Sequence, residues 1–255
     1  MSYRYSLAVI SAAALMLSTA ATGAFAADQL PAADAASWSG CYLGANAGYA
    51  RADADATDAP FLYDPDIDTW LSWNGAGAPF EAIGMDDGGL AGGVEAGCDR
   101  EFDLGGTAFV LGGVIDFSLM NLGATGTSAI SSDTHTNFDI DWAASARVRA
   151  GVAASDVLFY VTGGYALANV DVRAYDRQGP NAMDVSGGGA EGGWVAGGGV
   201  EWRFQPNWSV GLEYLHYDFG TVTATGEAIE PAGAFPRFEN DVTLDTIRVG
   251  LKWRM

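Results

Sequence analysis

The chain has 255 residues, 32 of them acidic and 12 basic, and its formal net charge at pH 7 is −20. Binding to nucleic acid needs a basic surface, so this acidic composition excludes that class of partner. The 8 Trp, 10 Tyr and 12 Phe residues exclude a disordered chain. Two cysteines are too few for a disulfide-dense scaffold or a Cys-based zinc site.

The first 26 residues have the pattern of a secretory signal peptide. Arg4 supplies a positive charge, residues 7–17 form an apolar run, and residues 24–26 (AFA) fit an A-x-A cleavage site. A transmembrane anchor is the alternative, but this run is too short to span a bilayer as a helix. We therefore expect a signal peptide over residues 1–26 and a single secreted domain over residues 27–255.

The mature chain alternates apolar and other residues with a period of two, which is typical of β-strands. The pattern is found in eight segments: 40–51, 88–101, 107–118, 142–152, 157–169, 193–204, 208–218 and 243–255. Each has about the ~9–11 residues that a tilted strand needs to cross a bilayer. No later stretch has the 18 consecutive apolar residues expected of a membrane-spanning helix.

The connections between these segments alternate between long and short. The long ones cover residues 52–87, 119–141, 170–192 and 219–242, and the short ones lie near residues 103–106, 153–156 and 205–207. Up-and-down barrels with short periplasmic turns and long extracellular loops have this rhythm. The sequence therefore predicts an all-β fold, an eight-stranded antiparallel up-and-down transmembrane β-barrel. A soluble secreted β-protein is the alternative.

Away from their ends, these segments carry their charged side chains on one parity. A Lys or Arg on the lipid face near the bilayer midplane costs roughly 2–4 kcal/mol, so the charged parity is expected to face the barrel interior. Segment 157–169 carries no charge, and there we favour Phe159, Val161, Tyr165 and Leu167 outward. The predicted inward charges are Glu95, Asp99, Asp116, Arg147, Arg149, Glu201, Arg203, Glu213, Arg248, Lys252 and Arg254.

Unpaired charges in a narrow interior are costly, so we expect these side chains to form an Arg–carboxylate network. The network is interpreted either as a gate or ion path, or as a plug of satisfied polar groups. The narrow bore of an eight-stranded barrel favours the plug. The rest of the acidity is expected in loops, turns and strand rims.

Aromatic residues gather near the strand ends and are interpreted as interfacial girdles, with ordinary core aromatics as the alternative. These residues are Trp38, Tyr42, Trp142, Trp194, Trp202, Phe204, Trp208, Tyr214 and Trp253.

Several stretches follow one another in a distinctive order. They include residues 38–49 (WSGCYLGANAGY), 160–164 (YVTGG), 199–202 (GVEW) and 248–255 (RVGLKWRM). This order resembles the porin-family, opacity-like small outer-membrane β-barrels of Gram-negative bacteria. The resemblance implies a barrel of the outer-membrane protein A transmembrane type in the cell outer membrane. It also implies outer-membrane lipids, lipopolysaccharide and the barrel assembly machinery as partners. Such barrels usually end in an aromatic residue, whereas this chain ends in Met255.

The chain departs from this family at Cys41 and Cys98, where aromatic residues are usual. Cys41 begins the first strand and Cys98 ends the second, so both lie near the periplasmic rim with outward parity. Because the periplasm is oxidising, we predict a cross-strand disulfide, with two free thiols as the alternative.

The sequence contains little that suggests catalysis or cofactor binding. A lipid-modifying barrel enzyme needs a His and a Ser together at the lipid-facing rim, and His216 has no Ser in a recognisable arrangement. Asp64, Asp66 and Asp68 partly match a calcium loop, but the required Gly and Glu are missing. They form either a weak divalent-cation site or, as the missing ligands favour, a solvated acidic loop.

We therefore expect no enzymatic activity and no cofactor. The expected function is a structural or surface-interaction role in the Gram-negative envelope, as for a surface antigen, with a possible extracellular ligand bound through the acidic loops. A narrow porin that passes small solutes or ions is the alternative, and a lipid-modifying enzyme is a third.

Overall fold

The computed structural model describes residues 37–177 and 181–255. The expected signal peptide, residues 1–26, lies outside the described residues. Among the described residues, no helix has both the length and the hydropathy of a membrane-spanning helix.

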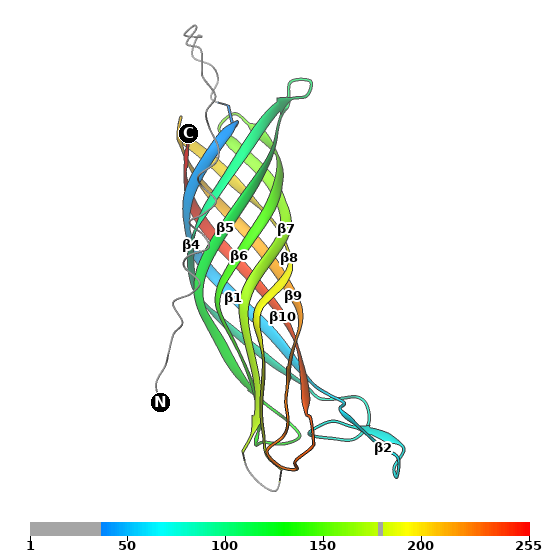
Figure 1. Ribbon diagram of the computed structural model, residues 1–255. Coiled ribbons are helices and arrows are strands. Elements are labelled where there is room, and N and C mark those ends of the chain that lie inside the picture. The colour runs from blue at the N-terminus through cyan, green and yellow to red at the C-terminus, as the bar shows by residue number, and fades with distance from the viewer. Residues whose placement is uncertain (1–36, 178–180) are drawn as a thin grey trace, which may run out of the picture. The chain divides into compact units, whose positions relative to one another are not determined.

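Eight long antiparallel strands close into a barrel (Figure 1). They are β1 (Gly40–Ala59), β4 (Ala82–Asp103), β5 (Ala108–Thr127), β6 (Thr134–Ala154), β7 (Val157–Asp176), β8 (Met183–Gln205), β9 (Trp208–Thr225) and β10 (Arg237–Arg254). Each strand pairs with its neighbours in chain order, and β10 pairs with β1. A separate hairpin of β2 (Leu62–Asp64) and β3 (Thr69–Leu71) lies between β1 and β4. The predicted fold is confirmed.

The strands are about two-thirds longer than the sequence pattern suggested. They have 18 to 23 residues each, so strand covers most of residues 119–141 and 170–192 and about half of residues 219–242, and the prediction of long loops there is wrong. The connection between β1 and β4 is still long, because residues 60–81 lie outside the barrel strands. The three short turns fall where they were expected, and we call their end of the barrel the periplasmic end. The opposite end, with the β2–β3 hairpin, is called the extracellular end.

About half-way along the barrel, the polar and apolar residues of each strand change places between the inward and outward faces. Strand β10 shows this change and explains why the strands are longer than predicted. Near the periplasmic end its outward residues, such as Ile247 and Val249, are apolar and exposed, while Arg248 points inward. Towards the extracellular end the parity is unchanged, but exposed Asp241 points outward and buried Leu244 inward. Lipid favours apolar side chains outside the barrel, and water favours polar ones. The strands therefore continue as a barrel beyond the membrane.

The extracellular half of the lumen is a hydrophobic core. All eight strands contribute buried side chains, among them Ala54, Ile83, Leu122, Phe138, Val172, Val185, Phe219 and Leu244. The outward faces of the same half carry acidic residues that are partly or fully exposed. We call these the acidic belt: Asp53, Asp55, Asp86, Asp139, Asp141, Asp171, Asp184, Asp218, Glu239, Asp241 and Asp245. Much of the acidity therefore lies on strand faces, and the prediction that it lies in loops, turns and strand rims is wrong for these residues.

In the membrane-spanning half, the side chains that the charge pattern assigns to the lipid face are exposed on the outside of the barrel. Leu90 on β4 is 83% exposed and Val148 on β6 is 67% exposed. On β7, whose facing the charges could not assign, Phe159 and Tyr165 are exposed and the outward assignment is confirmed.

Candidate functional site

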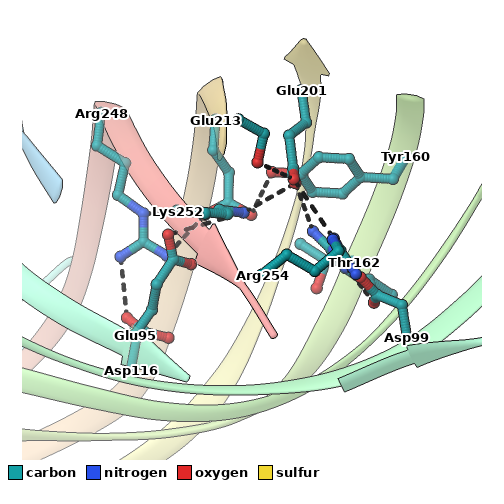
Figure 2. Close-up of polar contacts among 12 residues, drawn as sticks. Glu95, Asp99, Asp116, Tyr160, Thr162, Glu201, Glu213, Arg248, Lys252 and Arg254 are labelled. Atoms are coloured by element: carbon teal, nitrogen blue, oxygen red, sulfur yellow. Dashed lines mark hydrogen bonds and ion pairs between the residues drawn. The ribbon is translucent and has the colours of Figure 1, made fainter. Parts of the chain in front are cut away.

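Charged side chains gather inside the membrane-spanning half of the barrel (Figure 2). All those that the sequence assigns to the interior are buried there. They are Glu95 and Asp99 on β4, Asp116 on β5, Arg147 and Arg149 on β6, Glu201 and Arg203 on β8, Glu213 on β9, and Arg248, Lys252 and Arg254 on β10. Their ion pairs form two layers across the lumen.

The outer layer, nearer the extracellular end, is a ring of alternating charges. Arg147 bridges two carboxylates, with Nη2 3.1 Å from Asp116 Oδ2 and Nη1 3.0 Å from Glu213 Oε1. Arg248 bridges the same two, with Nη1 2.9 Å from Asp116 Oδ1 and Nη2 2.6 Å from Glu213 Oε2. The Tyr160 hydroxyl donates a hydrogen bond to Glu213 Oε1 at 3.1 Å. Because every charge has two opposite neighbours, the ring offsets the cost of removing these groups from water.

The inner layer, nearer the periplasmic end, is built around Asp99 and Glu201. Arg149 joins them, with Nε 2.7 Å from Asp99 Oδ1 and Nη1 3.0 Å from Glu201 Oε2. Arg254 adds a contact of 3.0 Å to Asp99, and Lys252 one of 3.1 Å to Glu201. The inner layer therefore binds three cations to two carboxylates.

Glu95 supplies the fifth carboxylate, which balances the formal charge of the two layers. Its Oε1 lies 3.7 Å from Lys252 Nζ. Arg203 pairs instead with Asp156 in the periplasmic turn, at 3.3 Å. Five carboxylates and five cations then remain, and the network has no net formal charge. Gly112 makes room for it, because a Cβ there would lie 2.0 Å from Asp99 Oδ1.

Trp38 covers the periplasmic end of the network. Its ring centroid lies 4.6 Å from the guanidinium carbon of Arg203 and 5.5 Å from that of Arg254. Its backbone N–H donates to Glu101 Oε2 at 2.7 Å, and its carbonyl accepts from Arg254 at 2.6 Å. Trp38 and Tyr42 are each 1% exposed. Their assignment to the lipid-facing girdle is therefore wrong, because both rings stack on cations inside the barrel.

Two small cavities lie beside the charges of the network. Two interior cavities, both lined by Asn46 and Arg248, have volumes of about 10 Å³ each. Such a volume holds about one water molecule. The buried atoms Asn46 Nδ2 and Thr246 Oγ1 have no protein partner, and these two residues line one of the cavities. The arrangement fits an isolated structural water better than a path for solutes.

A second polar cluster holds the loop between β1 and β4 over the extracellular end. The carboxylate of Asp58 accepts the backbone N–H groups of Trp73 at 2.9 Å and Asn74 at 2.7 Å. Glu81 accepts the Ser128 hydroxyl at 2.6 Å, which ties this loop to the loop after β5. Trp73 packs against the hydrophobic core. Sequence reasoning missed this cap, because nothing in the local pattern shows that the loop folds back.

The two carboxyl groups of this cap are shifted in opposite directions. Burial raises the pKa of Asp58 above its usual range, and the N–H groups of Asn74 and Trp73 only partly oppose this. Burial also acts to raise the pKa of Glu81, but hydrogen bonds from Ser128 and neighbouring backbone outweigh it and leave that pKa lowered.

Cys41 and Cys98 form a disulfide in the structure. They face each other in the register of β1 and β4, close to the periplasmic end. Both side chains point outward, so the bond joins two wall strands and takes no part in the interior network.

The acidic segment proposed as a weak metal site is arranged as a turn. The Asp66 N–H donates to Asp64 Oδ1 at 2.9 Å, and the Tyr63 hydroxyl donates to Asp68. Within residues 37–177 and 181–255, no three acidic, His or Cys side chains are grouped so as to hold a metal ion.

His216 lies on the outer surface near the boundary between apolar and acidic faces. Its Nδ1 is 2.8 Å from Asp245 Oδ1, and the Tyr214 hydroxyl donates to the same oxygen at 2.5 Å. The ring also lies 5.4 Å from that of Trp194. These contacts describe an interfacial polar cluster, and they include no serine that could act as a nucleophile.

Comparison with known proteins agrees with this geometry. A family model described as "Outer membrane protein beta-barrel domain" matches residues 12–254. The chain belongs to this family. Its location is the cell outer membrane, and the short-turn end of the barrel is periplasmic in such proteins.

Several outer-membrane proteins are similar to this chain over most of its length. The "31 kDa outer-membrane immunogenic protein" of Brucella melitensis is 28% identical over 257 residues, covering 96% of this chain and 98% of that protein. Among solved structures, outer membrane protein OprG from Pseudomonas aeruginosa has a TM-score of 0.47 at 10% identity, with 85% of this chain and 97% of that chain covered. The outer membrane protease OmpT from Escherichia coli has the same TM-score and coverage at 8% identity. Structural likeness at this level carries no inference about activity.

Proposed function

We propose that this outer-membrane barrel is a closed, non-enzymatic envelope protein with a structural and surface-interaction role. Its transmembrane half anchors the chain in lipid. Its extracellular half raises an acidic wall and the loops above the membrane surface, where they can contact an extracellular ligand. Outer-membrane lipids and lipopolysaccharide are its surroundings, and the barrel assembly machinery is the partner that we infer for its insertion.

The observation that carries the proposal is the filled lumen. From the periplasmic end outward, Trp38, the neutral charge network, the hydrophobic core and Trp73 follow one another along the barrel axis. A polar pore needs a continuous wet path, whereas an apolar core excludes ions and water. The charged interior that favours the porin alternative is therefore closed off on its extracellular side.

Single-channel recording tests the closed barrel. Protein whose folding is verified by its heat-modifiable gel mobility is inserted into a planar bilayer. We expect no discrete conductance steps. Reproducible steps of one size would overturn the closed barrel and make a narrow porin the better reading.

The structural role is tested separately in cells. A strain that lacks the protein should leak periplasmic contents or become sensitive to detergent, and the intact chain should restore resistance. Equal resistance with and without the protein would leave the surface interaction as the remaining role.

A further inference from the structure

The β2–β3 hairpin stands apart from the barrel wall at the extracellular end, where it projects sideways (Figure 1). Its strands pair Tyr63 with Trp70, and the two rings meet edge-on with centroids 5.5 Å apart. The hairpin belongs to neither the hydrophobic core nor the acidic belt. Neither core packing nor the acidic belt therefore accounts for its exposed side chains.

The hairpin exposes large apolar side chains to water. Trp70 is 53% exposed and Ile67, at the tip, is 59% exposed, while Leu62 and Tyr63 are exposed as well. An isolated two-stranded hairpin is marginally stable in water. Exposed apolar clusters rimmed by polar residues are typical of interaction surfaces. The hairpin is thus a surface that a partner can cover and complete.

Its charges indicate which kind of partner fits. Asp64, Asp66 and Asp68 alternate with the apolar side chains, and residues 60–81 contain no Lys or Arg. The carboxylate of Asp68 accepts the Tyr63 hydroxyl, so aromatic and acidic groups are held side by side. Aromatic faces beside carboxylates attract Arg and Lys through cation–π contacts and ion pairs. An anionic lipid surface would be repelled by the same three carboxylates.

We propose that this hairpin is a docking site for a cationic polypeptide. Arg or Lys side chains of the partner stack on Tyr63 and Trp70 and pair with the flanking carboxylates. Apolar side chains of the partner cover Leu62 and Ile67. The inference rests on the proposed surface-interaction role and gives it a location and a partner class.

Binding of a fluorescent oligo-arginine peptide to the full chain, folded in zwitterionic detergent micelles, tests the proposal. Anisotropy measures affinity, and an oligo-glutamine peptide serves as the uncharged probe. The variant Y63A/W70A should weaken binding of oligo-arginine by roughly tenfold, since each ring contributes one cation–π contact. The single variant Trp70→Phe keeps an aromatic face and should retain most of the affinity.

The whole chain is strongly acidic, so a control must distinguish binding at the hairpin from general attraction of the peptide to negative charge. The variant D64N/D66N/D68N should weaken binding strongly. The matched variant D53N/D55N/D241N removes the same charge from the acidic belt and should change affinity by less than about twofold, because exposed charges farther away are screened by salt. Equal losses in the two triple variants, or wild-type affinity in Y63A/W70A, would overturn the proposal.

Two further outcomes keep this proposal distinct from the proposed function. A dimer that dissociates in Trp70→Ala, detected by light scattering, would assign the hairpin to a second copy of the chain and overturn the cationic partner. Conductance steps together with hairpin-dependent peptide binding would overturn the closed barrel and leave the docking site standing.

Discussion

Replacing Glu213 by Gln should destabilise the barrel strongly, because this carboxylate is bound by two buried guanidinium groups. Arg147 lies 3.0 Å away and Arg248 lies 2.6 Å away. In Glu213→Gln both cations are left with Asp116 as the single carboxylate of the outer layer. Removing one partner of a buried ion pair typically costs 3–5 kcal/mol, so we expect a loss of roughly 4 kcal/mol in the free energy of unfolding.

Equilibrium urea unfolding in lipid vesicles, followed by Trp fluorescence and by gel mobility, measures this loss. The matched control is Glu239→Gln, since Glu239 is a partly exposed carboxylate paired with Arg237 on the outer face. Exposed pairs contribute about 0–1 kcal/mol, so the control should stay close to wild type. The double variant E213Q/R248M removes one charge of each sign and should recover part of the loss, because contacting residues couple by about 0.5–3 kcal/mol.

A loss of less than about 1 kcal/mol in Glu213→Gln would contradict a dry network of paired charges. It would mean that water reaches the network and solvates Arg147 and Arg248. The interior would then be wetter than the cavities of about 10 Å³ suggest, and the porin alternative would gain support.

Three other predictions concern the wall, the core and the cap. Cys41→Ala together with Cys98→Ala, which opens a bond across 57 residues of sequence, should lower stability by up to about 4 kcal/mol in urea titrations. Phe238→Ala in the fully buried core should cost about 3–5 kcal/mol and speed protease cleavage of the extracellular half. The pKa of Glu81 is lowered in the folded chain, so its ionised carboxylate stabilises the cap. This stabilisation is fully present above the usual glutamate pKa near 4.5, and it is lost as the pH falls through the lowered pKa. Hydrogen exchange of residues 60–81 should therefore show the loop loosening in acid, and Glu81→Gln should remove that part of the pH dependence.

The membrane-spanning half was predictable because lipid imposes one rule on its outer face. Charges such as Arg147 and Glu213 cannot face lipid, so their parity assigned whole strands. The same parity rule applies to one of the two aromatic residues that were wrongly assigned to the girdle. Tyr42 shares its parity with inward Asn46, so its burial could have been found. Trp38 precedes β1 and has no strand parity, so its position under Arg203 and Arg254 depends on how the chain enters the barrel.

The strands of the extracellular half were predicted as loops because the residue type expected on the outward face changes at the membrane boundary. The period-two alternation of the strand continues across that boundary. Residues 50–56 read ARADADA, which alternates as regularly as any lipid-facing strand. With lipid as the assumed surroundings, charged residues at the outward parity indicate a loop. With water as the surroundings, the same pattern predicts a strand with alanine inside and aspartate outside. The small inward alanines of β1 then leave room for bulky partners such as Phe138 and Phe238, which no single strand reveals.

The change from lipid to water outside the barrel also explains why the lumen is filled by paired charges in one half and by a hydrophobic core in the other. In the membrane half the outward face takes the apolar residues, so the inward positions are polar and must pair with one another, as Arg248 does with Asp116 and Glu213. Above the membrane the outward face takes the charges, and the inward positions become an ordinary hydrophobic core around Leu244 and Phe138. A conducting path would have to break paired charges in one half and open a dry core in the other. Each cost is several kcal/mol, so both act together to keep the barrel shut.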